Sequence, residues 1–135
     1  MRVLITAGPT REKIDPVRFI TNYSSGKMGY ALAQAAAEKG HDVVLVSGTV
    51  TLKCPESVKE FYSVESAAEM AEKAFELFPS CDAAIMVAAV ADYRPNRAVP
   101  RKQRHRLGIP ELCFVSAHDR SAEHLVPFAE LAWRR

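Results

Sequence analysis

The chain has 135 residues, enough for one domain with a buried core and too few for two domains of ordinary size. Hydrophobic residues make up 48% of it and charged residues 25%, which excludes a disordered or fibrous chain, and no apolar run approaches the roughly eighteen residues of a membrane span. The formal net charge of +2 is unevenly distributed, because residues 1–95 hold ten Lys and Arg against twelve Asp and Glu, whereas residues 96–135 hold eight against four.

The first half of the chain begins with an apolar run over residues 3–7 that ends at a Gly-Pro pair, and this pattern predicts a buried strand. A long polar loop is expected from residue 10 to about residue 25. A helix is then predicted over residues 27–39, with Gly40 as its stop and with one apolar face made of Ala31, Leu32, Ala35 and Ala36. Residues 43–46 predict a second buried strand.

The next part of the chain continues the alternation of strands and helices. A third strand is expected over residues 59–64, and Ser66 with Glu69 forms a capping box that opens a helix ending at Pro79. The apolar positions of this helix are Met70, Ala71, Ala74, Phe75 and Phe78. Residues 83–90 are the most apolar stretch and predict a central strand covered on both faces. The series predicts an α/β fold, a Rossmann-like three-layer domain with a mainly parallel sheet.

The sequence after residue 95 has a weaker pattern, and its fold is expected to be incomplete. Residues 111–116 could form a short strand and residues 121–133 a helix, so we expect a domain over residues 1–95 and a divergent basic tail over residues 96–135. Such a tail could bind nucleic acid, but its few aromatic residues are typical of a core rather than of a base-stacking surface. We therefore expect no nucleic-acid partner and no membrane partner.

The three cysteines, Cys54, Cys81 and Cys113, are far apart and contain no CxxC pair. They indicate reduced thiols, without a disulfide framework or a zinc site. Together with the absence of a signal-peptide pattern, they predict a cytoplasmic protein.

Two segments are candidates for a binding site, because ligands of an open parallel sheet bind beyond the carboxyl ends of its strands. The first contains Gly8 and continues with Ser24 and Gly26 at the start of the first helix, where serine hydroxyls and free N–H groups could hold phosphate. The alternative is structural: a serine caps the helix, while Gly26 and Gly29 allow it to pack closely on a strand.

The first segment does not fit the common nucleotide-binding motifs. A P-loop would need a glycine where Thr21 stands, the dinucleotide fingerprint GxGxxG is absent, and no acidic residue follows the second strand. Tyr23 and Lys27 have the spacing of the Tyr-x-x-x-Lys pair of short-chain dehydrogenases, but that pair belongs on a helix farther downstream. A nicotinamide cofactor is therefore disfavoured.

The second segment follows the apolar stretch and contains Met86, Val87, Ala88 and Asp92. Its small residues would let a base or ribose lie against the backbone, and Asp92 could bind a ribose hydroxyl, a base amine or a metal-bound phosphate. The alternative is an Asp–Arg surface pair at the end of a strand, which would contribute about 0.2–1 kcal/mol.

Taken together, the two segments closely resemble phosphopantothenate–cysteine ligase, a family that in bacteria is commonly fused behind a flavin-dependent decarboxylase. The resemblance covers about 95 residues and is carried by ITAGPTRE (5–12), IDPVRFITN (14–22), SSGKMG (24–29) and AAVADYRP (88–95). It implies a ligase of coenzyme A biosynthesis whose partners are 4′-phosphopantothenate and L-cysteine. It also implies CTP as a substrate and Mg²⁺, with no flavin expected in this part, and it leaves open a homodimer and the choice of CTP or ATP.

The resemblance also implies roles for individual residues. Asn22 would lie at the acyl-cytidylate intermediate and act in its conversion to product, and Arg18 would face the same substrate. Met86, Val87, Ala88 and Asp92 would hold the cytidine nucleotide, and the phosphate site considered above would add Gly8, Ser24 and Gly26 to the nucleotide-binding residues. The structural alternative for Asn22 is an Asx turn before the helix.

The tail departs from the family pattern. The family has a Lys-x-Lys-Lys segment whose first lysine contacts the nucleotide phosphates, and Lys102 falls at that position when the sequence is counted without gaps. A lysine there could neutralise phosphate charge in the transition state, but Gln103, Arg104 and His105 follow it. The alternatives are therefore a solvated lysine, and a nucleotide-binding module without ligase activity. An NAD(P)-dependent oxidoreductase is a less favoured reading.

Overall fold

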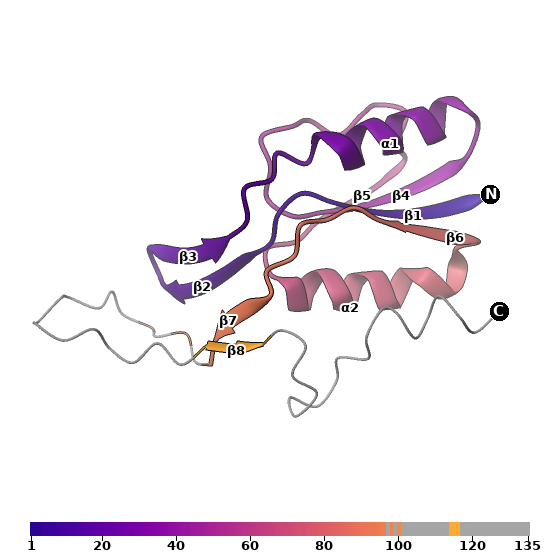
Figure 1. Ribbon diagram of the computed structural model, residues 1–135. Helices are drawn as coiled ribbons and strands as arrows, with labels where there is room; N and C mark the ends of the chain where they lie inside the picture. The colour runs from indigo at the N-terminus through magenta and orange to yellow at the C-terminus, as the bar shows by residue number, and fades with distance from the viewer. Residues whose placement is uncertain (97, 99, 101–113, 117–135) are drawn as a thin grey trace, which may run out of the picture.

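The computed structural model describes residues 1–96, 98, 100 and 114–116 of the chain. Its elements, drawn in Figure 1, are β1 (Arg2–Ala7), β2 (Arg11–Asp15), β3 (Arg18–Thr21), α1 (Lys27–Glu38), β4 (Asp42–Ser47), β5 (Glu60–Ser63), α2 (Ala67–Leu77), the 3₁₀ turn η1 (Phe78–Ser80), β6 (Ala83–Met86), β7 (Tyr93–Pro95) and β8 (Phe114–Ser116).

The main sheet has the order β5-β4-β1-β6, and every pair in it is parallel. Helix α1 covers one face of this sheet and α2 covers the other (Figure 1). The predicted α/β fold with a mainly parallel sheet is therefore confirmed, and the strands expected near residues 3–7, 43–46 and 59–64 are present.

The core consists of two layers because β1 and β4 are covered on both faces. Alternate side chains of these strands pack toward α1, where Ile5 and Leu45 meet Tyr30, while Leu4 and Val44 pack toward α2. All four strand side chains are fully buried. Burying one such side chain contributes about 1.5–3 kcal/mol to stability. Because both faces of the two strands are buried, their sequences are nearly continuous apolar runs.

The predicted face of α1 is only partly confirmed, because Leu32 and Ala36 pack against the core, whereas Ala31 and Ala35 are exposed to solvent. The helix instead faces the sheet with Gly29, Tyr30 and Ala33. A Cβ atom at Gly29 would lie 2.4 Å from the Cβ of Ala7, so the absence of a side chain there sets the rotation of the helix. Alanines occur all around α1 and do not identify its buried side.

The N-terminus of α2 has the predicted capping box. The Ser66 hydroxyl accepts from the backbone N–H of Glu69 at 3.2 Å, and the Glu69 carboxylate accepts from that of Ser66 at 3.4 Å. Met70, Ala71 and Ala74 are buried as predicted, and Leu77 is buried as well.

Residues 10–25 are not one polar loop as predicted, because β2 and β3 form an antiparallel hairpin. This hairpin extends beyond the main sheet (Figure 1). Its turn is held by Asp15, whose Oδ1 accepts from the backbone N–H groups of Val17 and Arg18, both at 2.9 Å. Its base is attached to α2, since Oε1 of Glu12 accepts from the first helical N–H, that of Ala67, at 2.8 Å.

The prediction of a central strand over residues 83–90 is also wrong. Strand β6 ends at Met86, and it is the edge of the main sheet in the described part of the chain. Ile85 and Met86 are 37% and 47% exposed, so the strand is not covered on both faces. The strand expected over 111–116 is present at Phe114–Ser116 as an antiparallel partner of β7. The helix expected over 121–133 lies outside the described residues.

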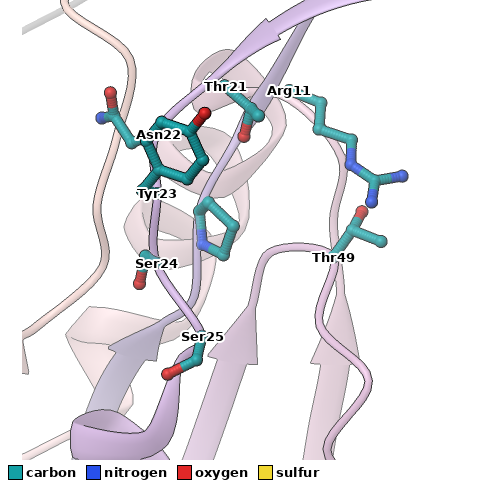
Figure 2. A pocket seen from close by; sticks show the side chains of 8 residues that line it. Arg11, Thr21, Asn22, Tyr23, Ser24, Ser25 and Thr49 are labelled. Atoms are coloured by element: carbon teal, nitrogen blue, oxygen red, sulfur yellow. The ribbon is translucent and has the colours of Figure 1, made fainter.

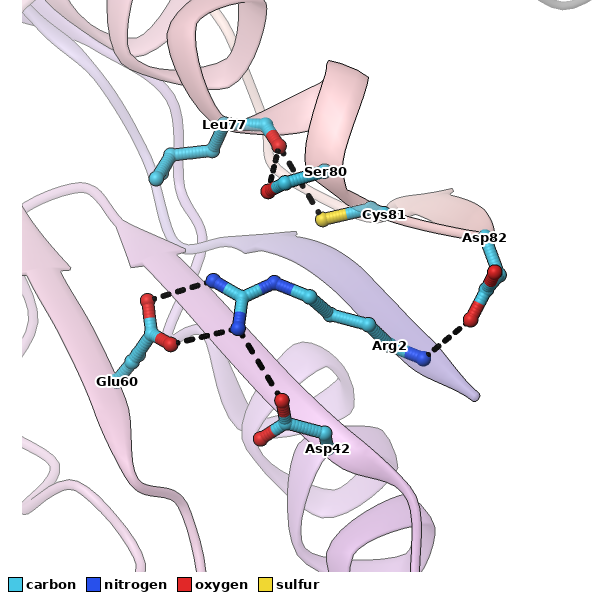
Figure 3. Close-up of polar contacts among 7 residues, drawn as sticks. All are labelled: Arg2, Asp42, Glu60, Leu77, Ser80, Cys81 and Asp82. Atoms are coloured by element: carbon cyan, nitrogen blue, oxygen red, sulfur yellow. Dashed lines mark hydrogen bonds and ion pairs between the residues drawn. The ribbon is translucent and has the colours of Figure 1, made fainter.

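Arg2 holds the N-terminal ends of the strands of the main sheet together (Figure 3). Its guanidinium lies 3.1 Å from Asp42 of β4 and 2.8 Å from Glu60 of β5, and its backbone N–H donates to Asp82 before β6 at 2.6 Å. The carboxylates of Glu60 and Asp42 raise the pKa of Arg2, with Glu60 as the main cause. One residue therefore connects all four strands at the end opposite the candidate site.

Candidate functional site

Three segments of the chain meet beyond the carboxyl ends of β1 and β6. The first is residues 8–10 after β1, the second is residues 21–26, from the last residue of β3 to the start of α1, and the third is residues 87–92 after β6. Pro9 and Ala89 form a parallel β-bridge, and the N–H of Ala89 donates to the carbonyl oxygen of Gly8 at 2.9 Å. The two segments singled out in the sequence therefore lie side by side at the sheet edge where ligands of this fold bind.

Asn22 connects these segments. Its Nδ2 donates to the carbonyl oxygen of Val90 at 2.8 Å and to that of Ala89 at 3.4 Å. Carbonyl oxygens only accept, so the NH₂ group must face them and Oδ1 must face the other way. The Asx turn considered for Asn22 is not formed, since the N–H of Ser24 donates to its backbone carbonyl oxygen at 2.9 Å.

Two buried threonines that the sequence analysis did not single out hold the third segment in place. The Thr6 hydroxyl accepts from the N–H groups of Val87 at 3.2 Å and Ala88 at 3.3 Å. The Thr10 hydroxyl accepts from the N–H of Ala91 at 3.0 Å. Both threonines are fully buried. The signal that could have identified Thr6 was a hydroxyl residue inside an apolar strand; Thr10 lies three residues after the end of that strand.

Thr10 also connects to the second segment, because its carbonyl oxygen accepts from the Thr21 hydroxyl at 2.7 Å. Thr21 directly precedes Asn22, and Asn22 bonds back to residues 89 and 90. The hydrogen bonds therefore close a ring through Thr10, residues 21–22 and residues 89–91, which fixes the three segments relative to one another.

Gly8 and Gly26 have φ angles of +73° and +75°, which L side chains rarely adopt. A Cβ atom at either position would lie less than 3.0 Å from Cγ1 of Val50. Gly26 is the N-cap of α1, and no side-chain hydrogen bond caps that helix, in contrast to α2. The Ser24 hydroxyl accepts from the N–H of Gly26 at 3.3 Å instead.

These contacts test the structural alternative for Ser24, Gly26 and Gly29, in which a serine caps α1 and the glycines only allow the helix to pack closely on a strand. The close packing expected of Gly29 is confirmed by its approach to Ala7. Neither Ser24 nor Ser25 caps α1. The first-turn N–H groups of α1 therefore have no side-chain cap, as an anion site at a helix N-terminus requires, and phosphate binding by Gly8, Ser24 and Gly26 stays a prediction.

An open pocket of about 380 Å³ lies in front of the second segment. Its lining residues, shown in Figure 2, are Pro9, Arg11, Thr21, Asn22, Tyr23, Ser24, Ser25 and Thr49. Apart from Arg11, the lining side chains are uncharged, and most of them carry a hydroxyl or an amide group. The pocket is suited to a polar ligand.

The predicted nucleotide contacts of the third segment lie around the end of β6. Met86 is half exposed at the strand end, while Val87 and Ala88 are partly buried along Thr6. Asp92 is exposed and has no ion-pair partner among the described residues, so the expected alternative of an Asp–Arg pair is not observed there.

Arg18 lies at the turn of the hairpin and is not a lining residue of the pocket. Its guanidinium contacts Oδ2 of Asp15 at 2.6 Å, and this contact is the main reason why the pKa of Asp15 falls to about 2. Its predicted role toward substrate is neither supported nor contradicted by this placement. Lys102 lies outside the described residues.

The described residues contain no group of three His, Cys, Asp or Glu side chains arranged to hold a metal ion. In the same part of the chain, no helix is long and apolar enough to cross a membrane.

Comparison with known proteins gives consistent matches. A family model described as the C-terminal domain of DNA/pantothenate metabolism flavoproteins matches residues 1–124. The chain is similar to the coenzyme A biosynthesis bifunctional protein CoaBC of Bacillus subtilis, with 51% identity over 78% of the chain, and to that of Vibrio parahaemolyticus, with 58% identity over 74%. It spans only 26% and 25% of the lengths of these two relatives.

Among solved structures, the chain is similar to the crystal structure of the C-terminal domain of CoaBC. The TM-score is 0.68 and the identity 56%, over 72% of this chain and 49% of that one.

Proposed function

Because the chain belongs to the family of the C-terminal domain of DNA/pantothenate metabolism flavoproteins, we propose that it acts in coenzyme A biosynthesis as a ligase joining 4′-phosphopantothenate to cysteine. The observation that carries this proposal is the pair of hydrogen bonds from Asn22 to Ala89 and Val90. They join the two motif segments on which the resemblance to the ligase rests. A substrate-binding segment and a nucleotide-binding segment would have to be adjacent in such an enzyme.

The proposed reaction has two steps. The carboxylate of 4′-phosphopantothenate attacks the α-phosphorus of CTP, which forms an acyl-cytidylate and releases pyrophosphate. The amine of cysteine then attacks the acyl carbon, loses a proton and displaces CMP, so that an amide bond forms. CTP rather than ATP is part of the proposal, on the strength of the resemblance alone.

The nucleotide would lie along the third segment and the N-terminus of α1. Met86, Val87 and Ala88 would contact the cytidine, since small side chains and partly exposed backbone let a flat ring approach closely. Gly8, Ser24 and Gly26 would receive the phosphates at the uncapped helix end. Asp92, exposed and unpaired among the described residues, is available for a ribose hydroxyl or a base amine.

Asn22 would act in the second step. Because its NH₂ group is bonded to two carbonyl oxygens, the group that it offers to a ligand is Oδ1. We assign to Oδ1 the acceptance of a hydrogen bond from the incoming cysteine amine, which would orient the nitrogen lone pair toward the acyl carbon. Orientation of this kind is lost when the amide is not held in place.

The Mg²⁺ ion would arrive with CTP. The described part of the chain lacks a cluster of metal-ligating side chains, which fits an ion that keeps its water and the nucleotide phosphates as ligands and takes at most one carboxylate from the protein. Asp92, which is exposed after the end of β6, is a carboxylate that could serve. The charge of the ion would offset the phosphate charge that Lys102 is also proposed to neutralise.

A nucleotide-binding module without ligase activity is the second candidate function. The sequence favours it at one point, because Gln103, Arg104 and His105 follow Lys102 where the ligase family has further lysines. Cytoplasmic location and a homodimer stay predictions under either function.

The experiment that tests the proposal measures pyrophosphate released by the full chain from CTP and 4′-phosphopantothenate, with and without cysteine, and with ATP in place of CTP. A ligase releases pyrophosphate with CTP, and cysteine allows further turnover. CTP binding without pyrophosphate release supports the second candidate. Neither binding nor release would refute both.

A further inference from the structure

We infer that Arg11 is a phosphate-binding residue of the pocket between the hairpin and α1. The inference rests on the proposed function, because the phosphate group would belong to one of its two phosphorylated substrates, CTP or 4′-phosphopantothenate. The resemblance to the ligase assigns no role to Arg11.

The composition of the pocket wall is the first observation. Arg11 is its one charged side chain among the described residues, and the other walls carry the hydroxyl groups of Thr21, Ser25 and Thr49. Figure 2 shows the Arg11 guanidinium on the same side of the pocket as Thr49, opposite Tyr23 and Ser24 in this view. A cation among hydroxyl donors without a carboxylate is the environment that an anion requires.

The second observation is that Arg11 has no carboxylate partner among the described residues. Four other cations of the described part do have one, namely Arg2, Lys13, Arg18 and Lys73. The difference is clearest within β2, where Lys13 contacts Glu65 at 2.6 Å although it lies only two residues from Arg11. The five N–H donors of the Arg11 guanidinium therefore remain available for a ligand.

The third observation is that the guanidinium is already held in position. It lies 4.6 Å from the centre of the Phe19 ring, and the backbone N–H of Arg11 donates to the carbonyl oxygen of Glu65 at 2.7 Å. Arg11 also pairs with Thr21 in the hairpin, which places it opposite the residue that precedes Asn22. A stacked, preorganised guanidinium loses little freedom on binding phosphate and offers two parallel donors to it.

The N-terminus of α1 adds further positive potential to the pocket that Arg11 lines. Ser25 lines the pocket, Gly26 is the N-cap, and no side chain caps the helix. The partial positive charge of the helix end and the full charge of Arg11 therefore act on an anion in this pocket together.

The test compares Arg11→Gln and Arg11→Lys with the control Lys13→Gln in the full chain. The control removes the same unit of charge from the same strand, but from an exposed side chain outside the pocket lining. Binding of three probes is measured by titration calorimetry: CTP with Mg²⁺, 4′-phosphopantothenate, and tripolyphosphate. Melting temperatures without ligand show whether each variant is folded.

We expect Arg11→Gln to weaken the binding of one phosphorylated substrate about 10- to 100-fold, the usual effect of losing a hydrogen bond to a charged group. The substrate affected identifies the source of the phosphate. Arg11→Lys should bind with intermediate affinity because lysine keeps the charge and loses the fork. Lys13→Gln should bind both substrates like the unmutated chain.

Unchanged affinity of folded Arg11→Gln for all three probes would overturn the inference and leave the proposed function standing. An equal loss in Lys13→Gln would also overturn it, since a general field effect would then be sufficient. If the unmutated chain binds neither substrate, the proposed function fails. Tripolyphosphate then decides: binding that depends on Arg11 supports the anion site, and no such binding rejects it.

Discussion

Nδ2 of Asn22 lies 2.8 Å from the carbonyl oxygen of Val90, a residue 68 positions later in the chain. The bond closes a ring that also includes Thr10 and Thr21, so the orientation of the Asn22 amide depends on residues from three segments. The site is therefore a product of the packing of β1, the hairpin and the segment after β6. A substitution in one segment should therefore change the positions of side chains in the other two.

Asn22→Asp should separate the two steps of the proposed reaction. A carboxylate cannot donate to the carbonyl oxygens of Ala89 and Val90, so the side chain should turn away from its present position. We expect pyrophosphate to be released once per site, followed by a stall before cysteine transfer. The measurement is pyrophosphate release with and without cysteine.

The comparison for this variant is Lys102→Ala, which should instead slow pyrophosphate release about 10²–10³-fold, because its proposed partner is phosphate charge. Normal cysteine-dependent turnover by Asn22→Asp would show that the amide is not required in the second step.

Thr10→Val should destabilise the protein through the loss of a single hydroxyl. Valine has nearly the same shape, but the N–H of Ala91 would lose its buried acceptor, which costs about 1–3 kcal/mol. Thr10→Ser keeps the hydroxyl and should recover most of the free energy of unfolding. Urea denaturation of both variants measures the difference. Equal stability of Thr10→Val and the unmutated chain would mean that Ala91 finds another acceptor.

The ion pair at the hairpin turn predicts a loss of stability in acid. The hydrogen bond from Arg18 is the main cause that lowers the pKa of Asp15 from 3.8 to about 2 in the folded chain. As the pH falls, Asp15 is therefore protonated at a higher pH in the unfolded chain than in the folded chain, and this difference favours unfolding. The contribution of Asp15 is complete above about pH 4 and is lost between about pH 4 and pH 2.

Asp15→Asn removes this titration and tests the assignment. The free energy of unfolding of the variant should lie below that of the unmutated chain near pH 6, and the gap should narrow as the pH falls toward 2. Urea denaturation at several pH values gives both curves. A gap that stays constant with pH would show that Asp15 does not contribute through its charge.

Features whose causes are local could be predicted from the sequence. The capping box of α2 depends on Ser66 and Glu69, three residues apart, and the buried strand β4 on a continuous run of valine and leucine. The hairpin was missed because β2 is built mostly from charged residues. It is stabilised by the Asp15–Arg18 contact and by the hydrogen bond from the N-terminus of α2 to Glu12. These polar contacts leave no apolar periodicity in the sequence from which a strand could be predicted.

The candidate site could be predicted as two motif segments but not as a geometry. That Asn22 bonds to residues 89 and 90 depends on the parallel pairing of β1 with β6, which brings together residues about 80 positions apart. The roles of Thr6 and Thr10 depend on the same pairing. Apolar character alone also misplaced Ile85 and Met86, because an edge strand and a central strand can have the same composition.

Asp92→Asn should weaken nucleotide binding and leave the fold intact. The side chain is exposed and has no ion pair with a described residue, so its replacement should change the free energy of unfolding by no more than about 0.5 kcal/mol. If Asp92 contacts the ribose, the base or the metal-bound phosphates, CTP should stabilise the variant less than it stabilises the unmutated chain.

Asp42→Asn, at the opposite end of the sheet beside Arg2, is the matched control and should show the reverse pattern, with lower stability and an unchanged response to CTP. Thermal unfolding with and without CTP and Mg²⁺ measures both quantities, since a ligand at a hundredfold excess over Kd adds about 2.7 kcal/mol. An Asp92→Asn protein that unfolds early and still responds fully to CTP would make Asp92 a structural residue.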